Sequence, residues 1–124
     1  MSDVVSICII EDSPLINKLF GTILKKDGYD ISQFKTGIDA LNWLKDNKPN
    51  LILMDILLPD YSGTELINLI KDLDGFENTK FVAVTGFTDA SDKEKYIKLG
   101  FNAFLSKPVN VAEFPKQIKS ILNQ

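Results

Sequence analysis

The 124-residue chain contains no histidine and, because all 14 of its basic residues are lysine, no arginine. Without histidine it cannot form a Ser-His-Asp or Cys-His catalytic site, a histidine-ligated metal site or a phosphohistidine of its own. Without arginine it cannot make the bidentate guanidinium contacts that hold bases and phosphates in many proteins. A net charge of −3 and a pI near 4.9 also argue against direct binding of nucleic acid.

Cysteine and long apolar runs are equally scarce. The single cysteine, Cys8, has no partner for an intrachain disulfide, so we interpret it as a buried strand residue in a reducing compartment. No apolar run approaches the roughly 20 residues needed to span a bilayer. The N-terminus lacks the basic start and the small-residue cleavage site of a secretory signal. We therefore expect a single-domain cytoplasmic protein, covering residues 1–124, without membrane insertion.

Short apolar runs alternate five times with longer stretches of helical spacing. Ser13 followed by Pro14 is typical of a helix start, and a second helix is predicted over roughly 38–47. Capping-box patterns at 62–65 and 91–94 predict the starts of two further helices. Strict alternation predicts a parallel sheet with helices on both faces, joined by right-handed crossovers. The predicted strands cover residues 4–10, 29–34, 51–55, 81–85 and 103–106.

The last predicted helix contains one conflicting signal. Asn110 and Glu113 have the spacing of a cap at its start, which would place Pro115 inside the helix. A proline there removes a backbone hydrogen bond and crowds the preceding turn. We therefore expect a bent or tightened first turn.

Five polar residues occur where the predicted strands end. Glu11 and Asp12 follow the first strand, Asp55 ends the third, Thr85 ends the fourth, and Lys107 follows the fifth. The carboxyl ends of strands in an open α/β sheet meet at the edge where ligands bind, so we expect these side chains to converge. Each residue alone could cap a helix or lie on the surface. The occurrence of the set at four strand ends is what indicates a functional site.

The chemistry of this set suits phosphoryl transfer. Three clustered carboxylates repel one another and favour a hard cation such as Mg²⁺, which prefers oxygen ligands. A carboxylate can also attack phosphorus to form an aspartyl phosphate. The ammonium of Lys107 could balance the charge of the phosphoryl group, and the hydroxyl of Thr85 could donate to one of its oxygens. Gly86, directly after Thr85, leaves room for the group to enter.

Four motifs connect these residues with a known family: IIEDSP at 9–14, LILMDILLPDYSG at 51–63, FVAVTG at 81–86 and FLSKPV at 104–109. In this order and spacing the sequence resembles the receiver domain of two-component response regulators over essentially its whole length. The resemblance implies an α/β fold of the flavodoxin-like (βα)5 type, a doubly wound parallel sheet with strand order 2-1-3-4-5. It also implies a phosphoacceptor that assists its own phosphorylation and dephosphorylation rather than an enzyme with a separate substrate.

The resemblance assigns roles to the acidic residues. Asp55 matches the phosphoacceptor, which takes its phosphoryl group from a sensor histidine kinase, a phosphotransfer protein or a small phosphodonor. Glu11 and Asp12 match the acidic pair that binds Mg²⁺, or Mn²⁺, together with Asp55 and the backbone carbonyl of Leu57. The missing histidine agrees with this assignment, because the donor must then be another molecule.

The remaining site residues are assigned in the same way. Thr85 matches the hydroxyl residue whose movement switches the domain, and Lys107 matches the lysine that contacts the phosphate. The bond between Lys107 and Pro108 is expected to be cis, as in the family. Phe104 matches the aromatic switch position, although an ordinary core phenylalanine is an equally good interpretation.

Two further features concern the lifetime of the phosphorylated form and the surface that binds a downstream partner. Leu57 and Phe87 occupy positions where the family often has polar residues that position the attacking water, so we expect slow loss of the phosphoryl group. Residues 89–124 contain six lysines and four acids, whereas residues 1–88 contain eight lysines and thirteen acids. In receivers the face formed by the last two helices and the strand between them is the usual docking surface. We therefore expect a downstream protein partner there, although a solvated face would explain each lysine singly.

Two alternatives remain open from the sequence. The chain could be the receiver part of a longer regulator with a DNA-binding or enzymatic output. It could instead be a small phosphatase or a flavin-binding protein on a related α/β frame. Against the latter, such a phosphatase needs a second aspartate where Leu57 stands, and the residues after Asp12 do not form a Ser/Thr/Gly-rich phosphate loop.

Overall fold

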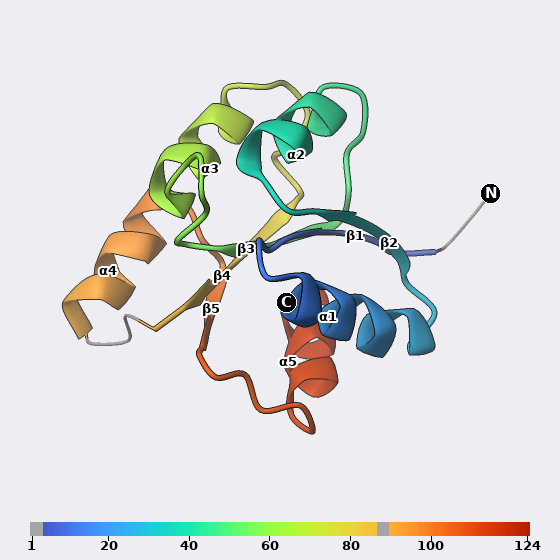
Figure 1. The fold of residues 1–124 in the computed structure, drawn as a ribbon. Helices are drawn as coiled ribbons and strands as arrows, with labels where there is room; N and C mark the ends of the chain where they lie inside the picture. The colour runs from blue at the N-terminus through green and yellow to red at the C-terminus, as the bar shows by residue number, and fades with distance from the viewer. Residues whose placement is uncertain (1–3, 87–89) are drawn as a thin grey trace.

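A parallel sheet forms the centre of the computed structural model, which describes residues 4–86 and 90–124 (Figure 1). Within those residues the sheet has five strands in the order β2-β1-β3-β4-β5. The predicted fold class and strand order are therefore confirmed. The strands are β1 (Ser6–Ile10), β2 (Asp30–Phe34), β3 (Leu51–Asp55), β4 (Lys80–Thr85) and β5 (Ala103–Ser106), and the helices are α1 (Pro14–Lys26), α2 (Gly37–Leu44), α3 (Gly63–Lys71), α4 (Ala90–Leu99) and α5 (Phe114–Leu122).

The helices form two layers, with α1 and α5 on one face of the sheet and α2, α3 and α4 on the other (Figure 1). Because successive strand residues point to opposite faces, each central strand contributes to two cores. Ile7 and Ile9 of β1 pack with Phe20 of α1, whereas Cys8 and Ile10 pack on the α2–α3 side. Cys8 is fully buried, as expected. The central strands are therefore apolar until their carboxyl ends, where the polar residues begin.

Two of the predicted helix starts are confirmed by their hydrogen bonds. The Ser13 hydroxyl accepts a bond from the backbone N–H of Ile16 at 3.4 Å, directly before α1. At the start of α3, Ser62 and Glu65 each accept a bond from the other's backbone N–H, which completes a capping box. Helix α1 begins directly after the loop that carries Glu11 and Asp12, and α3 follows the loop that begins after Asp55.

The predicted start of the last helix is wrong. Asn110 instead caps a separate turn, in which its side-chain oxygen accepts bonds from the N–H groups of Ala112 (2.9 Å) and Glu113 (3.1 Å). Helix α5 begins only at Phe114, so Pro115 lies in its first turn. A proline is favourable there because the first helical N–H groups have no intrahelical partner. The conflict in the sequence is resolved by a later helix start.

Other boundaries also differ from the predicted ones. Helix α4 begins at Ala90, so Ser91 lies in its first turn and is not the residue before it. Helix α2 ends at Leu44 rather than near 47, because the side chains of Asn47 and Lys48 take over carbonyls of its last turn. None of the helices in the described residues has the length and apolar character that crossing a membrane requires.

Candidate functional site

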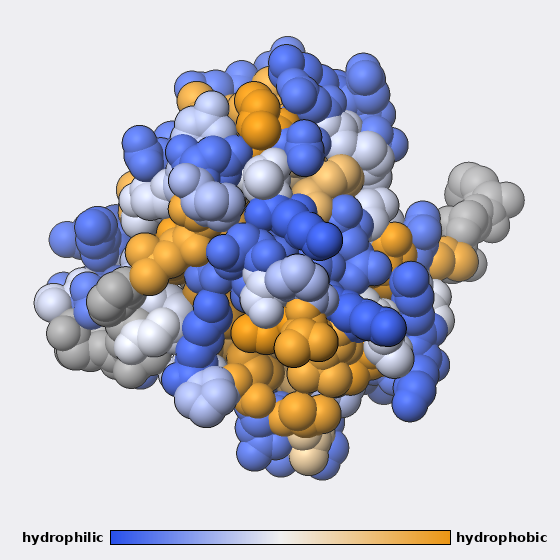
Figure 2. All heavy atoms as spheres, viewed as in Figure 1, coloured by the Kyte–Doolittle hydropathy of each residue, from blue (hydrophilic) through white to orange (hydrophobic). Residues whose placement is uncertain are grey.

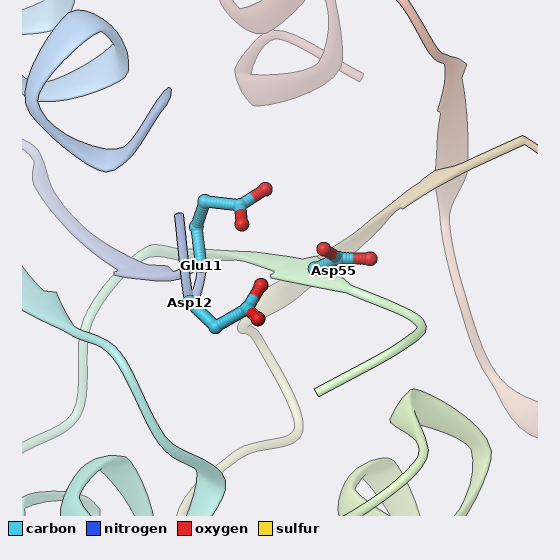
Figure 3. Close-up of side chains that lie close together, drawn as sticks. All are labelled: Glu11, Asp12 and Asp55. Carbon is cyan, nitrogen blue, oxygen red and sulfur yellow. The ribbon is translucent and has the colours of Figure 1, made fainter. Parts of the chain in front are cut away.

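Three carboxylates meet at the carboxyl edge of the sheet, as the sequence predicts. Glu11 and Asp12 follow β1, and Asp55 ends the adjacent strand β3 (Figure 3). One oxygen of each lies within 4.8 Å of the others. Glu11 and Asp55 are only 2% and 4% exposed, whereas Asp12 is exposed. The cluster therefore has two buried acids and one acid that faces solvent.

Lys107, directly after the edge strand β5, also contacts this cluster. Its Nζ lies 2.7 Å from Asp55 Oδ2 and 3.6 Å from Glu11 Oε1. Its backbone N–H donates to the Thr85 carbonyl at 3.0 Å, which continues the β4–β5 pairing beyond Ser106. The Lys107–Pro108 peptide bond is cis, which confirms that prediction.

Glu11 is the most buried of the three acids. Its Oε2 accepts a bond from the Ser13 N–H at 2.9 Å, whereas its buried Oε1 accepts no hydrogen bond within the described part of the chain. Burial raises the pKa of the Glu11 carboxyl to about 6; the Ser13 N–H opposes this shift, and the charge of Asp55 adds to it. A buried carboxylate oxygen without a donor is costly, so this oxygen would gain from a bound cation.

The two oxygens of Asp55 have different partners. Oδ1 accepts a bond from the Leu57 N–H at 3.0 Å, and Oδ2 accepts one from Lys107. The backbone of the loop after β3 is thus in direct contact with this carboxylate. The side chain of Leu57 is 63% exposed, so its apolar surface lies open beside the site.

Thr85 and Phe104 lie on the α4 side of the site. The Thr85 hydroxyl is buried and lies 3.5 Å from the hydroxyl of Tyr96, a residue of α4 that the sequence did not single out. Phe104 is half-buried, with Lys93 Nζ 5.5 Å from its ring centroid. Phe87, the other position expected to affect lifetime, lies outside the described residues.

A buried asparagine beside the acidic pair was missed from the sequence. The Asn17 side-chain amide donates to the Glu11 carbonyl at 2.8 Å and to the Phe34 carbonyl at 2.9 Å. Its oxygen accepts a bond from Gln33 at 2.7 Å. Asn17 shares the inward face of α1 with Phe20, three positions later, and a polar residue on such a face was the signal available.

Comparison with known proteins identifies the family. A family model described as the response regulator receiver domain matches residues 7–119. The chain belongs to this family. The receiver is 38% identical over 117 residues to the polar-differentiation response regulator DivK of Brucella anthropi, an alignment that covers 94% of the chain and 95% of that protein.

Solved structures give the same result. A CheY-like receiver domain protein of Methanospirillum hungatei is 30% identical, with a TM-score of 0.87 and coverage of 98% of the chain and 95% of that structure. The receiver domain of a Pseudomonas aeruginosa sensor histidine kinase is 25% identical, with a TM-score of 0.82 and coverage of 98% and 99%. That domain was solved with a magnesium ion coordinated in its active-site cleft. The phosphatase and flavin-protein alternatives are not favoured by these findings.

Proposed function

We propose that the receiver accepts a phosphoryl group on Asp55, in a reaction that requires Mg²⁺ or Mn²⁺ bound by Glu11, Asp12, Asp55 and the backbone carbonyl of Leu57. The observation that carries this proposal is the convergence of three carboxylates and one ammonium at the edge of the sheet. Two of these acids are buried, and like charges buried together are unfavourable unless positive charge shares the site. Membership of the receiver family supports the same proposal.

The residues fit a hard divalent cation. All the candidate ligand atoms are oxygens, and the buried Glu11 Oε1 has no hydrogen-bond donor among the described residues. Such an ion would lower the negative charge that opposes the approach of a phosphoryl group. Mg²⁺ keeps several waters, which suits a site with one acid, Asp12, open to solvent.

The side chains then have distinct roles in the transfer. An oxygen of Asp55 forms a bond to phosphorus while the bond from phosphorus to the donor breaks, and the donor leaves with the electron pair of that bond. Lys107, already in contact with Asp55, stays close and balances the charge of the incoming oxygens. Thr85 turns its hydroxyl from Tyr96 toward a phosphoryl oxygen, and Phe104 then moves inward as the strand end rearranges.

No residue of 1–124 can supply a phosphohistidine, because these residues include no histidine, so the donor lies outside them. We place a protein donor, a sensor histidine kinase or a phosphotransfer protein, at an apolar groove between α1 and the segment after β5. The groove has a volume of about 440 Å³ and includes Lys107, so a protein bound there would reach Asp55. Leu19 and Val111 are 42% and 53% exposed on it, and Figure 2 shows this hydrophobic region. The groove is lined by Ile16, Leu19, Phe20, Ile23, Val84, Lys107, Pro108, Val109, Val111 and Phe114.

The output partner is a protein that binds the α4-β5-α5 face. This face contains Phe104 and a hollow that includes Lys116, and it carries the lysine excess of the C-terminal part of the chain. Movement of Phe104 on phosphorylation would directly change the shape of this α4-β5-α5 face. Because the chain lacks arginine and is acidic overall, the partner is a protein rather than nucleic acid.

The proposal is tested by intact-mass measurement after incubation with acetyl phosphate or phosphoramidate. We expect one phosphoryl adduct on the wild type that requires Mg²⁺, and no adduct on Asp55→Asn. Asp46→Asn offers a control for the loss of a carboxylate away from the acidic cluster, and it should still take the adduct. An adduct that forms without metal, or that persists in Asp55→Asn, would contradict the assignment.

A further inference from the structure

The loop between β3 and α3, residues 56–62, is held closely at both of its ends. At its start the Ile56 N–H donates to the Val84 carbonyl at 3.1 Å, and the Leu57 N–H donates to Asp55 Oδ1 at 3.0 Å. At its end Leu57 and Ser62 form an antiparallel bridge, and the Gly63 N–H donates to the Ile56 carbonyl at 2.7 Å. In the middle of the loop, Leu58 and Tyr61 pack against the core, and one further polar attachment joins the loop to α2.

Asp60 provides that attachment. Its two carboxylate oxygens accept bonds from the backbone N–H groups of Gly37 and Ile38, both at 2.8 Å. Desolvation opposes the ionised form, but hydrogen bonds from the backbone N–H groups of Gly37, Ile38, Asp60 and Tyr61 together outweigh it and hold the pKa of Asp60 below its usual range. The carboxylate therefore binds the first two N–H groups of α2, which lie 23 and 22 positions earlier in the chain.

The first turn of α2 has a cap of its own. The Thr36 hydroxyl accepts a bond from the Asp39 N–H at 3.2 Å, and the Thr36 carbonyl accepts one from the Ala40 N–H. Thr36 thus caps α2 without Asp60, although Gly37 is buried and its N–H gains from the Asp60 carboxylate. The contact also joins the loop to α2, in addition to the bonds that hold the two ends of the loop.

The 56–62 loop and the start of α2 are also in close contact. A Cβ atom on Gly37 would lie 2.8 Å from a ring carbon of Tyr61 and 3.2 Å from Asp60 Oδ1. Only glycine allows the backbone of α2 to approach the loop this closely. Gly37 and Asp60 thus form a close contact between the first turn of α2 and the 56–62 loop.

We propose that Asp60 is a positioning residue for phosphoryl transfer, which holds the 56–62 loop against α2 so that the Leu57 backbone keeps its place beside Asp55. This inference rests on the function proposed above, because it assigns the Leu57 carbonyl to the metal. Asp60 would act without touching metal or phosphoryl group, by reducing the freedom of a ligand-bearing backbone.

The test compares Asp60→Ala and Asp60→Asn with Thr36→Ala. An asparagine cannot accept from both N–H groups, because half of its amide is a donor. Thr36→Ala weakens the same helix terminus and makes no change to the loop, so it is the matched control. Three quantities are measured for each variant: amide hydrogen exchange of residues 56–63 in metal-free protein, Mg²⁺ affinity by calorimetry, and the rate of phosphoryl loading at subsaturating and saturating Mg²⁺.

We expect faster exchange at Leu57 and about tenfold weaker Mg²⁺ binding in Asp60→Ala, the low end of the effect of residues that orient metal ligands. The rate of phosphoryl loading should fall mainly at subsaturating Mg²⁺. The rate for Asp60→Asn should lie between those of Asp60→Ala and the wild type. Thr36→Ala should leave all three quantities close to those of the wild type.

Unchanged Mg²⁺ affinity in Asp60→Ala, or equal losses in Thr36→Ala, would overturn the positioning role while leaving the proposed function intact. A wild type that binds no Mg²⁺ and takes no phosphoryl group would overturn the proposed function, and this inference with it.

Discussion

Lys107 lies 2.7 Å from Asp55 although the two residues come from strands that are not neighbours, with β4 between them. Burial lowers the pKa of Lys107, but the hydrogen bond and charge of Asp55, together with the charge of Glu11, outweigh it and raise that pKa above its usual value. The ammonium is therefore the positive charge that balances two buried acids in the absence of metal.

Replacing Lys107 by alanine should destabilise the metal-free receiver and make it more responsive to Mg²⁺. Removing one partner of a buried ion pair costs about 3–5 kcal/mol, and because the lysine side chain is 33% exposed we expect a loss of about 2 kcal/mol in the free energy of unfolding. Mg²⁺ should restore more stability to Lys107→Ala than it adds to the wild type, since the uncompensated carboxylates bind it more tightly. Urea unfolding with and without Mg²⁺ measures both effects.

The matched control is Lys119→Ala, which removes an exposed lysine on α5. Its unfolding free energy should stay within about 0.5 kcal/mol of the wild type. Equal stabilisation of Lys107→Ala and wild type by Mg²⁺ would show that the lysine does not balance the carboxylates.

Leu57 should determine how long the phosphorylated form lasts. Its apolar side chain is 63% exposed beside Asp55 and cannot orient a water molecule for attack on phosphorus. We expect slow loss of the phosphoryl group from the wild type and about tenfold faster loss from Leu57→Asn, less than the 10²–10⁴ of a full general base. Intact mass followed over time after removal of the donor gives both rates.

A suitable control for Leu57→Asn is Leu69→Asn, on the partly exposed face of α3. It adds the same amide away from the acidic cluster and should leave the lifetime unchanged. Rapid loss from the wild type, or an equal effect of the two substitutions, would refute the role of Leu57.

Asn17→Ala should be among the most destabilising single changes near the site. It removes the amide that donates to the Glu11 carbonyl, whereas the Phe34 carbonyl still accepts a bond from the Glu11 N–H and Gln33 still donates to the Asn17 carbonyl. An unsatisfied buried polar group costs about 1–3 kcal/mol, so we expect a loss of about 2 kcal/mol in the free energy of unfolding. Urea unfolding measures this loss, with the exposed Asn42→Ala variant as the control. Similar free energies of unfolding for the two variants would contradict a stabilising role of the Asn17 hydrogen bonds.

The sequence predicted the fold and the acidic cluster because both depend on periodicity and topology. Apolar strands that alternate with helices lead to a parallel sheet, and residues after β1, β3 and β5 then share one edge. Glu11, Asp55 and Lys107 could be placed together on this basis alone. No knowledge of side-chain orientation was needed for that step.

The contacts that support the site could not be predicted in the same way. Asp60 caps a helix more than 20 positions earlier in the chain, and nothing in a local pattern relates it to Gly37. The contact between Thr85 and Tyr96 likewise depends on how α4 packs against β4. The start of α5 was misplaced because Asn110 caps a turn with the same local bonds that begin a helix.

Asp60 should also give the receiver a stability that depends on pH. Its pKa in the folded protein lies below the usual value, so it stabilises the fold above the usual aspartate pKa of about 4. That contribution is lost as pH falls through the lowered folded pKa. We expect the wild type to exceed Asp60→Asn by about 1 kcal/mol at pH 7, the typical value of a helix cap, and by progressively less below about pH 4.

Urea unfolding of both proteins at pH 7, 5 and 3 tests this, and the difference between them removes the titration of all shared groups. Asp46→Asn, at an exposed position just after α2, shows the effect of losing one negative charge without a cap. Because the bonds from Gly37 and Ile38 need the ionised carboxylate, a wild-type advantage that stays constant down to pH 3 would mean that Asp60 contributes nothing through its charge.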